Sequence, residues 1–505
     1  MQNEPRALLT SLYRAAVEGA SPVEKTRIAV TAWLEEAKRR GESDAPIRLF
    51  AMGKAATAMA AGALQALGAA NREPVCGVVI CSHQPPDAPH GTSAFPDAFT
   101  VHVGDHPVPG PASLDAGEAL SVAVHEVRDG DIALVLISGG TTALAAAPVA
   151  ALSLAIGDVE QAQARIANLA DTLLESGLAI HEMNAIRRRV LRWGAGRLAV
   201  ALHSRGARAI PVFAISDVIG DDPAVIGSGP CSPDALDDAT FLALLDAHHV
   251  RSALERDMSI FLGLSGSGTP PVVPTVTHPA FAIVRYQIVA RNADAVAALA
   301  AAARQAGVTQ VTVESHALIG EAALLGNELA QRALSAAATT DAGESALIAF
   351  GGEPVVHLRD TYQHAFEASD DDDQRTEEAV GPDDIASPDK PSGSGDEPMS
   401  GGRMQVLALA AAFALEAAAE CGNRSARRIT LLAAGTDGRD GPTDSAGAIV
   451  DAVVPALARR AGRQPERDLL TGRSWFPLDA AAALLRTGPT GTNVMDVVAI
   501  LISPA

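Results

Sequence analysis

The chain alternates short, continuous apolar runs with longer stretches in which apolar residues recur every three to four positions. Residues 5–40 follow the second pattern, with charged residues between the apolar ones, which predicts helices. Apolar runs at 47–52, 75–81, 132–137 and 210–215 contain almost no polar alternation, and helical stretches follow several of them. Because strands of this kind are buried on both faces, the pattern predicts a parallel sheet covered by helices.

A second series of apolar runs and helices follows residues 263–275, a stretch rich in glycine, serine and proline that is typical of a linker. The apolar runs of this series lie at 281–289, 308–314, 345–350 and 429–434. A chain of 505 residues is also too long for one core of ordinary size. We therefore expect two α/β domains, at 1–265 and 281–505, joined by a linker at 266–280 and separated by a cleft.

An acidic segment at about 360–400 interrupts the second domain. Between Phe366 and Glu397, twelve acidic residues stand against Arg375 and Lys390, so this stretch carries nearly half of the net charge of −21. It contains almost no large apolar side chains and cannot bury enough surface to order itself, so we expect a disordered insertion. An acidic chain with 3% aromatic residues has neither the basic surface nor the stacking platforms that nucleic-acid binding requires.

Targeting and redox signals favour a cytoplasmic enzyme with no membrane partner. The first twenty residues lack the basic-then-apolar order of a signal peptide. The longest alanine-rich apolar stretch, near 406–419, is too short to span a bilayer. The four cysteines form no Cys-x-x-Cys pair and no zinc-ligand spacing, which is typical of reduced thiols.

Small residues follow the apolar run at 132–137, in the order Ser138, Gly139, Gly140, Thr141 and Thr142. Such residues let backbone N–H groups approach a ligand, and the start of the following helix favours an anion. The alternative is a tight strand-to-helix turn in which Thr142 caps the helix. The loop is thus either a ligand-binding loop or a local turn.

Gly53 and Lys54 occupy the same kind of position after the first apolar run, where the lysine adds a positive charge. The segment is not a phosphate-binding P-loop, because Arg48 stands where the first glycine should be and Ala55 follows the lysine. A lysine after a strand is usually solvated, which is the alternative for Lys54.

Three carboxylates, Asp217, Asp221 and Asp222, follow the run at 210–215. Mg²⁺ is commonly held by one or two carboxylates together with substrate phosphates, which makes Asp217 and Asp222 candidate ligands. We expect two of the three acids to be structural, for example with Asp222 capping the next helix.

The segment at 435–444 places Asp437 and Asp444 among glycines, next to a strand end. It is not an EF-hand, because no glutamate occupies the closing position of a twelve-residue loop. It could bind a second cation or a polyol, or form a chain of Asx-turns. The loop at 487–493 offers the hydroxyl of Thr490 and the amide of Asn493 to a small polar ligand.

Glu353 and Arg403 flank the acidic segment, each next to a pair of glycines. If the insertion loops out, Arg403 opens a helix and points into the cleft, where its planar fork suits a carboxylate or a phosphate. The arginines at 187–189 and 192 are typical of a basic helix face. Residues 194–196 lack a preceding strand, which makes a dinucleotide-binding fingerprint there weak.

These features together favour phosphoryl transfer, whose catalysis is mostly positioning and charge stabilisation. The chain also resembles a known family, and the motifs that carry the resemblance run in order over nearly its whole length: AMGKAA (51–56), GDHPVPG (104–110), LISGGTTALAAAP (136–148), SGLAIHEMNAIRR (176–188), SDVIGDDPAVIGSGP (216–230), GEA (320–322), FGGEP (350–354), GGRMQ (401–405), GTDGRDGPTDSAGA (435–448) and TGPTGTNVMD (487–496). They look like those of the class II glycerate kinases, whose second domain is of the MOFRL type.

The resemblance implies a larger Rossmann-like N-terminal domain, a smaller α/β MOFRL-type C-terminal domain, and phosphorylation of D-glycerate to 2-phosphoglycerate with ATP and Mg²⁺. A homodimer is compatible with it. By motif, Lys54 matches a lysine that contacts phosphate or substrate, and Arg403 matches the arginine of the family's GGRNQ motif. Asp217 matches an aspartate that we assign to Mg²⁺ or to the glycerate hydroxyl.

The chain departs from the family pattern at two places. Thr141 and Thr142 stand where the family usually has glycine and serine, and Met404 replaces the asparagine of GGRNQ. These departures leave open a sugar-acid-binding protein without catalysis. The remaining alternative is an NAD(P)H-dependent reductase of hydroxypyruvate, a label that family members also carry.

Overall fold

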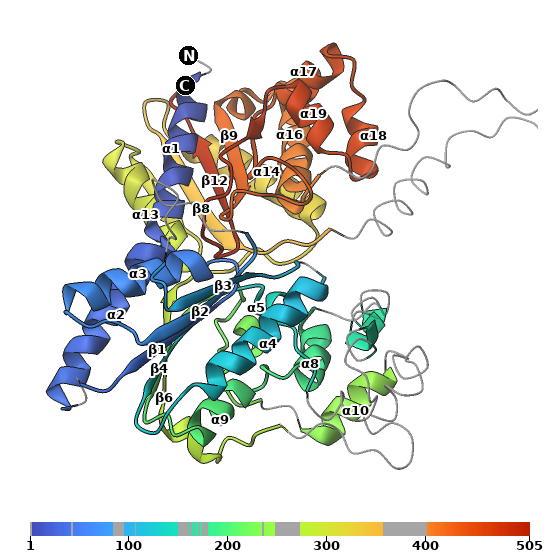
Figure 1. Ribbon diagram of the computed structural model, residues 1–505. Coiled ribbons are helices and arrows are strands. Elements are labelled where there is room, and N and C mark those ends of the chain that lie inside the picture. Colours follow the sequence, from blue (N-terminus) through green and yellow to red (C-terminus); the bar gives the residue numbers. More distant parts are fainter. Residues whose placement is uncertain are drawn as a thin grey trace, which may run out of the picture. The chain divides into compact units, whose positions relative to one another are not determined.

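The computed structural model describes residues 3–41, 44–83, 95–106, 108–149, 180–234, 237–247, 273–356 and 401–505, with parts of 161–173 (Figure 1). The acidic segment at 360–400 and most of the expected linker at 266–280 lie outside the described residues. The chain divides into two compact units. The N-terminal unit consists of Val17–Ala295 and Gly491–Met495, and the C-terminal unit consists of Met1–Ala16, Val296–Thr490 and Asp496–Ala505.

A six-stranded parallel sheet, in the order β3-β2-β1-β4-β5-β6, forms the centre of the N-terminal unit. Its strands are β1 (Ile47–Met52), β2 (Cys76–Cys81), β3 (Phe99–Val103), β4 (Ile132–Ile137), β5 (Ile210–Ile215) and β6 (Val284–Ala290). The central strands β1, β4 and β5 are buried along their whole length. The parallel sheet predicted from uninterrupted apolar runs is therefore confirmed.

Helices cover both faces of this sheet (Figure 1). The described helices of the unit are α2 (Pro22–Arg39), α3 (Ala56–Ala69), α4 (Pro111–His125), α5 (Thr141–Leu144), α8 (Ile180–Val190), α9 (Arg197–Ser204) and α10 (Asp238–Ala247). The apolar sides of α4 and α9 pack in one core with alternate residues of the central strands, such as Phe50, Val135 and Val212. The helices α2 and α3 lie on the opposite face (Figure 1).

Two strands of this sheet correct the expectations from sequence. The run at 281–289 was expected to open the second domain, but β6 pairs with β5 and completes the first sheet. Apolar pattern alone does not specify the partner of a strand. The edge strand β3 was not predicted, because it is only half-buried and carries Thr100 and His102 between its apolar residues.

The C-terminal unit contains a second six-stranded sheet, in the order β11-β10-β9-β12-β8-β7. Its strands are β7 (Gln310–Val313), β8 (Ala346–Gly352), β9 (Ile429–Gly435), β10 (Gly447–Val450), β11 (Leu484–Leu485) and β12 (Asp496–Ile502). Among the described strands of this second sheet, only β7 and β8 pair in parallel; the other neighbours are antiparallel. The strands expected at 308–314, 345–350 and 429–434 are present, whereas the central strand β12 was not predicted.

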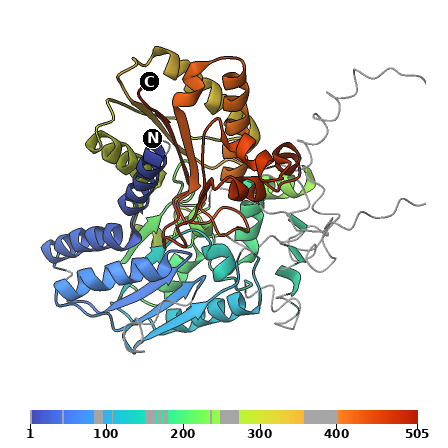
Figure 2. The same ribbon diagram turned by 90° about the horizontal axis from the view of Figure 1, so that it is seen from above.

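One face of the second sheet packs against a pair of alanine-rich helices, α14 and α16. The described helices of this unit are α1 (Asn3–Gly19, through Ala16), α13 (Asn292–Gln305, from Val296), α14 (Ala322–Thr339), α16 (Arg403–Glu420), α17 (Val454–Arg460), α18 (Pro465–Leu470) and α19 (Trp475–Ala480). Figure 2 shows α16 (orange) running along the strands of the sheet. A Cβ at Gly326 would lie 2.3 Å from the Leu407 carbonyl oxygen, so α14 and α16 approach each other as closely as backbones allow. No helix in the described part of the chain combines the length and apolar character that membrane crossing requires.

The start of the chain belongs to the C-terminal unit because α1 is hydrogen-bonded to it. The buried Tyr13 hydroxyl donates to the Gly435 carbonyl over 2.8 Å, at the end of β9. Arg6 donates to the carbonyls of Ile449 and Ala482. Burial raises the pKa of Tyr13 well above its usual value, so the hydroxyl keeps the proton that this bond needs.

Candidate active site

Two of the predicted loops are joined by backbone hydrogen bonds at the carboxyl ends of the neighbouring strands β1 and β4. The N–H of Lys54 donates to the Gly139 carbonyl over 2.8 Å, and the N–H of Ala55 donates to the Ser138 Oγ over 3.0 Å. A Cβ at Gly53 would lie 2.3 Å from that same Oγ, so only glycine fits there. Lys54 is thereby placed against the Ser138–Gly140 loop.

Gly139 and Gly140 form a surface on which three side chains converge. A Cβ at Gly139 would lie 1.6 Å from Asp217 Oδ2, so the carboxylate occupies the space that a side chain would fill. A Cβ at Gly140 would lie 3.2 Å from both Lys54 Cγ and His106 Cδ2. Two consecutive glycines thus bring Asp217, Lys54 and His106 to one place, as expected for the first two.

Asn493 reaches this site from the C-terminal end of the chain. Its Nδ2 donates to Asp217 Oδ2 over 3.2 Å. The short segment that carries it is tied to the N-terminal unit on both sides: Thr492 Oγ1 donates to the Ala20 carbonyl, and Asn292 Nδ2 donates to the Val494 carbonyl. The predicted residues Asp217 and Asn493 are therefore direct partners.

The acids that follow Asp217 serve the local structure. Asp221 pairs with Arg291 at 3.1 Å, and Asp222 Oδ1 accepts the N–H of Ala224 over 2.9 Å. This bears out the expectation that two of the three acids are structural. No group of three or more His, Cys, Asp or Glu side chains that could hold a metal ion assembles among the described residues.

The two threonines of the loop do not act as the predicted helix cap. The four-residue helix α5 begins at Thr141, and its N-cap is Gly140 in the left-handed conformation at φ +82°. Thr141 Oγ1 donates to the Ser138 carbonyl over 2.8 Å. Thr142 Oγ1 lies 2.6 Å from Ser228 Oγ, so its hydroxyl is turned toward the Gly227–Gly229 loop and away from its own backbone.

His106 is a site residue that the sequence analysis did not assign, although its GDHPVPG motif could have pointed to it. Burial, together with the charges of Lys54 and His83, lowers the pKa of His106 to about 4. The imidazole is therefore neutral at pH 7, with one ring nitrogen that donates and one that accepts. Its contact with Gly140 makes it a polar neighbour of Lys54 that carries no competing charge.

Arg403, at the first position of α16, binds two carboxylates of the C-terminal unit. Its Nε and Nη2 donate to Asp496 at 2.6 and 3.2 Å, and its Nη1 donates to Glu353 at 2.9 Å. Burial disfavours the positive charge, but Asp496 and Glu353 raise the pKa of Arg403 above its usual value. The structure thus joins the predicted Glu353 and Arg403 and adds Asp496, at the start of the unpredicted strand β12.

Asp440 caps the helix that Arg403 opens. Its carboxylate accepts the N–H groups of Met404 and Gln405 at 3.2 and 2.8 Å. A Cβ at Gly402 would lie 2.1 Å from Asp440 Oδ1, which explains the glycine before Arg403. Burial and the neighbouring Asp496 carboxylate together raise the pKa of Asp440 to about 7, although those two N–H groups and Arg403 lower it. The segment at 435–444 therefore stabilises the start of α16.

The other predicted residues of this unit make local contacts. Asp437 Oδ1 accepts the N–H of Arg439 over 3.0 Å, which is the Asx-turn given as the alternative. Thr490 Oγ1 donates to the Thr436 carbonyl. Asp444 lies at the surface, bound to Arg486 and Trp475, and these bonds lower its pKa.

Comparisons with known proteins place the whole chain among its relatives. Residues 8–263 match a domain of unknown function (DUF4147), and residues 394–496 match the MOFRL family. A D-glycerate 2-kinase of Thermotoga maritima is 29% identical over 456 residues, 90% of this chain and 90% of that protein. A putative hydroxypyruvate reductase of Agrobacterium vitis is 31% identical over 503 residues, 98% of this chain and 94% of that protein. A 2.70 Å crystal structure of glycerate kinase from Thermotoga maritima matches with a TM-score of 0.68 and 25% identity, covering 99% of this chain and 100% of that chain.

The chain belongs to the glycerate kinase family. The resemblance expected from the motifs is thereby confirmed, and so is the α/β fold with a MOFRL region in its C-terminal part. Within this family the replacement of asparagine by Met404 has a simple structural account: the side chain is fully buried in the apolar core around α16.

A dinucleotide fingerprint is also missing from this glycerate kinase family member at the place where the sequence suggested one. Gly194 and Gly196 lie between α8 and α9, and no strand of the described sheet precedes them. A Rossmann fingerprint places its glycines between a strand and a helix, so that the pyrophosphate meets the helix N-terminus. The structure of this segment gives the reductase alternative no support.

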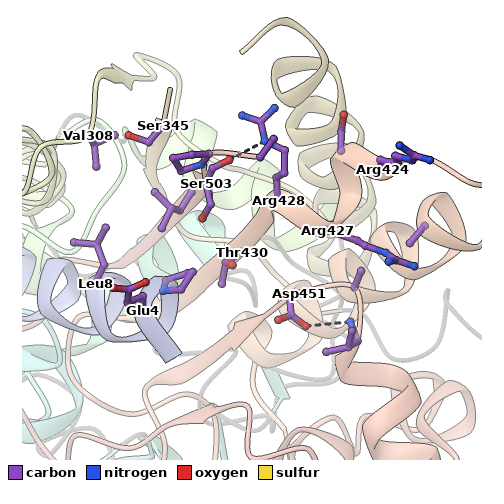
Figure 3. A pocket seen from close by; sticks show the side chains of 18 of the residues that line it. Glu4, Leu8, Val308, Ser345, Arg424, Arg427, Arg428, Thr430, Asp451 and Ser503 are labelled. Carbon is purple, nitrogen blue, oxygen red and sulfur yellow. Dashed lines mark hydrogen bonds between the residues drawn. The ribbon is translucent and has the colours of Figure 1, made fainter. Parts of the chain in front are cut away.

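The C-terminal unit contains a large hollow with a cavity volume of about 1300 Å³ (Figure 3). Its lining includes Arg424, Arg427 and Arg428 beside Glu4 and Asp451, so charges of both signs are present. Arg428 is bound to backbone carbonyls, among them that of Ser503 at 2.7 Å. None of the residues predicted for chemistry appears in its described lining, and we assign it no role in the reaction.

Replacing Gly139 with alanine is expected to lower kcat for the phosphorylation of glycerate about 10- to 100-fold. The reason is that the new methyl group displaces the Asp217 carboxylate. Steady-state kinetics of purified Gly139→Ala checks this. Gly68→Ala is the matched control, since Gly68 lies exposed on α3 with no atom within 4 Å of the new Cβ. Unchanged kcat in Gly139→Ala would show that the position of Asp217 does not matter for turnover.

Asp440 gives the C-terminal unit a pH-dependent stability. Its pKa in the folded state, about 7, lies above its ordinary value, so the folded protein binds this proton more tightly than the unfolded chain does. The contribution is full below about pH 4 and is lost as the pH rises through 7. We expect the free energy of unfolding of Asp440→Asn, relative to wild type, to increase between pH 5 and pH 8 in urea titrations. A difference that stays constant with pH would show that Asp440 is already ionised at pH 5.

Proposed function

We propose that the protein is a glycerate 2-kinase that transfers the γ-phosphoryl group of ATP to D-glycerate and forms 2-phosphoglycerate. The names of the curated relatives, including the D-glycerate 2-kinase of Thermotoga maritima, support the reaction. The structural observation that carries the proposal is the convergence of Lys54 and Asp217 on Gly139 and Gly140. A fixed cation and a carboxylate beside a backbone that carries no side chains are the parts that phosphoryl transfer to a hydroxyl requires.

In this mechanism the hydroxyl oxygen of glycerate forms the new bond to the γ-phosphorus, and the bond from that phosphorus to the bridging oxygen of ADP breaks. Asp217 orients the attacking hydroxyl and accepts its proton, while Asn493 holds the carboxylate through Oδ2. Lys54 stabilises the negative charge of the transferring group. His106 is neutral, so it can donate a hydrogen bond to the substrate without drawing Asp217 into an ion pair.

The residues present fit a Mg²⁺ ion that arrives with the nucleotide. The described residues provide no dedicated cage of three carboxylates, and Asp222 is occupied by its own turn. Asp217 remains as a single carboxylate at the loop surface, and Mg²⁺ in nucleotide sites is usually bound by one or two carboxylates and substrate phosphates. The ion would neutralise phosphate charge there.

In this proposal Arg403 binds an anionic group of a ligand through Nη1, the guanidinium nitrogen that donates to Glu353. The Asp496 side chain is 4% exposed and fixes the position of the arginine, whereas Glu353 is 38% exposed. An anionic group of a ligand can therefore replace Glu353 at Nη1 while the bidentate pair with Asp496 stays intact. Glu353 is, in this proposal, the counterion of the arginine in the absence of ligand.

Product identification tests the proposal directly. The purified protein is incubated with ATP, Mg²⁺ and D-glycerate, and phosphorus NMR identifies the products. We expect ADP and 2-phosphoglycerate in equal amounts. A 3-phosphoglycerate signal would reassign the hydroxyl that is attacked, and glycerate binding without ADP formation would indicate a binding protein. Oxidation of NAD(P)H that depends on hydroxypyruvate would instead support a reductase.

A further inference from the structure

One arginine of the basic stretch after residue 180 differs from its neighbours. The others are committed to structural partners: Arg188 to Asp234 and the Ala224 carbonyl, Arg189 to the ring of Phe241, Arg192 to Glu118 and Ser121, and Arg197 to the carbonyls of Arg188 and Leu191. Among the described residues, the buried Nε atoms of Arg187, Arg188 and Arg189 all have no hydrogen-bond partner. What sets Arg187 apart, in the part of the chain that the structure describes, is that the rest of its guanidinium has neither an ion pair nor a hydrogen bond.

The surroundings of Arg187 disfavour an isolated charge. The side chain is half-buried, and burial lowers the pKa of its guanidinium without an opposing carboxylate among the described residues. Removing a cation from water without a counterion is costly, and buried charges in proteins are normally paired. Arg187 therefore has the properties of a group that is completed by an anionic ligand.

Arg187 lines a small pocket together with Thr142 of the loop after β4. The pocket has a volume of about 40 Å³, and the other residues that line it are apolar, such as Pro109, Val190 and Leu191. Thr142 lies two residues beyond Gly140, on the loop that contacts Lys54 and Asp217. The pocket and the site of the proposed reaction therefore share this loop.

We propose that Arg187 and Thr142 bind the carboxylate group of the substrate and so select hydroxy acids over uncharged polyols. This inference rests on the proposed glycerate 2-kinase activity. The small volume of the pocket suits a planar carboxylate better than a phosphate with its hydration. A single guanidinium fork also matches a monovalent carboxylate through two parallel hydrogen bonds.

Ser228 orients the hydroxyl group of Thr142 for the proposed contact with the substrate carboxylate. The two hydroxyl oxygens lie 2.6 Å apart, and when Ser228 is the donor, the hydroxyl hydrogen of Thr142 points to another acceptor. Ser228 is held in place by its backbone, at φ +65° between two glycines that also have positive φ. Thr142, which stands where the family pattern has a serine, would then supply a hydroxyl donor beside Arg187.

The test measures how the effect of one substitution depends on the substrate. In Arg187→Met we expect the KM for D-glycerate to rise about 10- to 100-fold, the usual effect of losing a hydrogen-bonded charge pair. The KM for ATP is expected to change by less than about twofold. Glyceramide carries the same hydroxyls without the carboxylate, and its weak turnover should be equal in wild type and Arg187→Met. Arg208→Met, at an exposed arginine of the same unit, is the control.

Thermal unfolding separates this role from a structural one. Because Arg187 has no partner to lose among the described residues, Arg187→Met should unfold at the wild-type temperature or above it. A lower unfolding temperature with an unchanged KM for D-glycerate would overturn the proposal, and so would an equal loss of activity toward glyceramide. If the wild type itself forms no phosphoglycerate, the proposed function fails. If the wild type is active and Arg187→Met keeps its KM, only the present inference fails.

Discussion

Lys54→Met is expected to lower kcat about 100- to 1000-fold while the fold and the affinity for D-glycerate change little. The side chain adds a fixed positive charge beside Gly140, where charge develops on the transferring phosphoryl group. Removing one preorganised group of this kind from an active site typically costs a factor of about 10²–10³ in kcat. Steady-state kinetics with D-glycerate and ATP measure the loss, and circular dichroism checks that the protein is folded.

A matched lysine in the same unit provides the control. Lys25 pairs with Asp294 at 2.8 Å, with both side chains 31% exposed, so Lys25→Met removes a lysine without touching the site. We expect kcat to stay within about twofold of wild type in that variant, since exposed ion pairs contribute little. Near-wild-type turnover in Lys54→Met would remove Lys54 from the mechanism, and the alternative of a merely solvated lysine would then hold.

The second large effect is expected for stability, in Arg403→Met. The substitution leaves the Asp496 carboxylate buried without its bidentate partner and removes the counterion from Glu353. Removing one partner of a buried pair costs about 3–5 kcal/mol, and we expect the lower end, about 3 kcal/mol, because the Arg403 side chain is itself 34% exposed. The free energy of unfolding from urea titration checks this value.

Two further variants test the physical cause of the stability loss expected in Arg403→Met. Adding Asp496→Asn to Arg403→Met removes the unpaired charge, and we expect this double variant to regain part of the lost stability. Arg486 also binds two carboxylates, Asp444 and Asp479, but all three side chains are more than 40% exposed. Arg486→Met should therefore cost about 1 kcal/mol or less. An equal loss in Arg403→Met and Arg486→Met would show that burial of Asp496 is not the cause.

The proposed reaction site is built from segments that are distant in sequence. In the N-terminal unit, the ends of β1, β4 and β5 supply Lys54, Gly139 and Asp217, and the segment Gly491–Met495 returns to add Asn493. Parallel strands place their carboxyl ends at one edge of the sheet, so loops far apart in sequence meet there. This is why a glycine pair and single polar residues could be recognised as site candidates before their contacts were known.

Several expectations depended on information that local sequence does not contain. The run at 281–289 was recognised as a strand but placed in the wrong sheet, because its apolar pattern is the same in either location. Asp496 was overlooked as a site residue, although its motif was noted, because its partner Arg403 lies 93 residues away. Arg187 also could not be distinguished from its neighbouring arginines, since only the packed structure shows which of them have partners.

By itself, the sequence determined the character of each segment: which runs are buried strands, which glycines follow them, which family the motifs resemble and where the polar candidates stand. These properties depend on side-chain chemistry and on residues near in the chain. Only the tertiary structure decided strand partners, the mainly antiparallel second sheet, the pairing of Arg403 with Asp496 and Glu353, and which arginines have partners among the described residues. Such properties follow from contacts between distant segments, where burial sets the cost of leaving a charge unpaired.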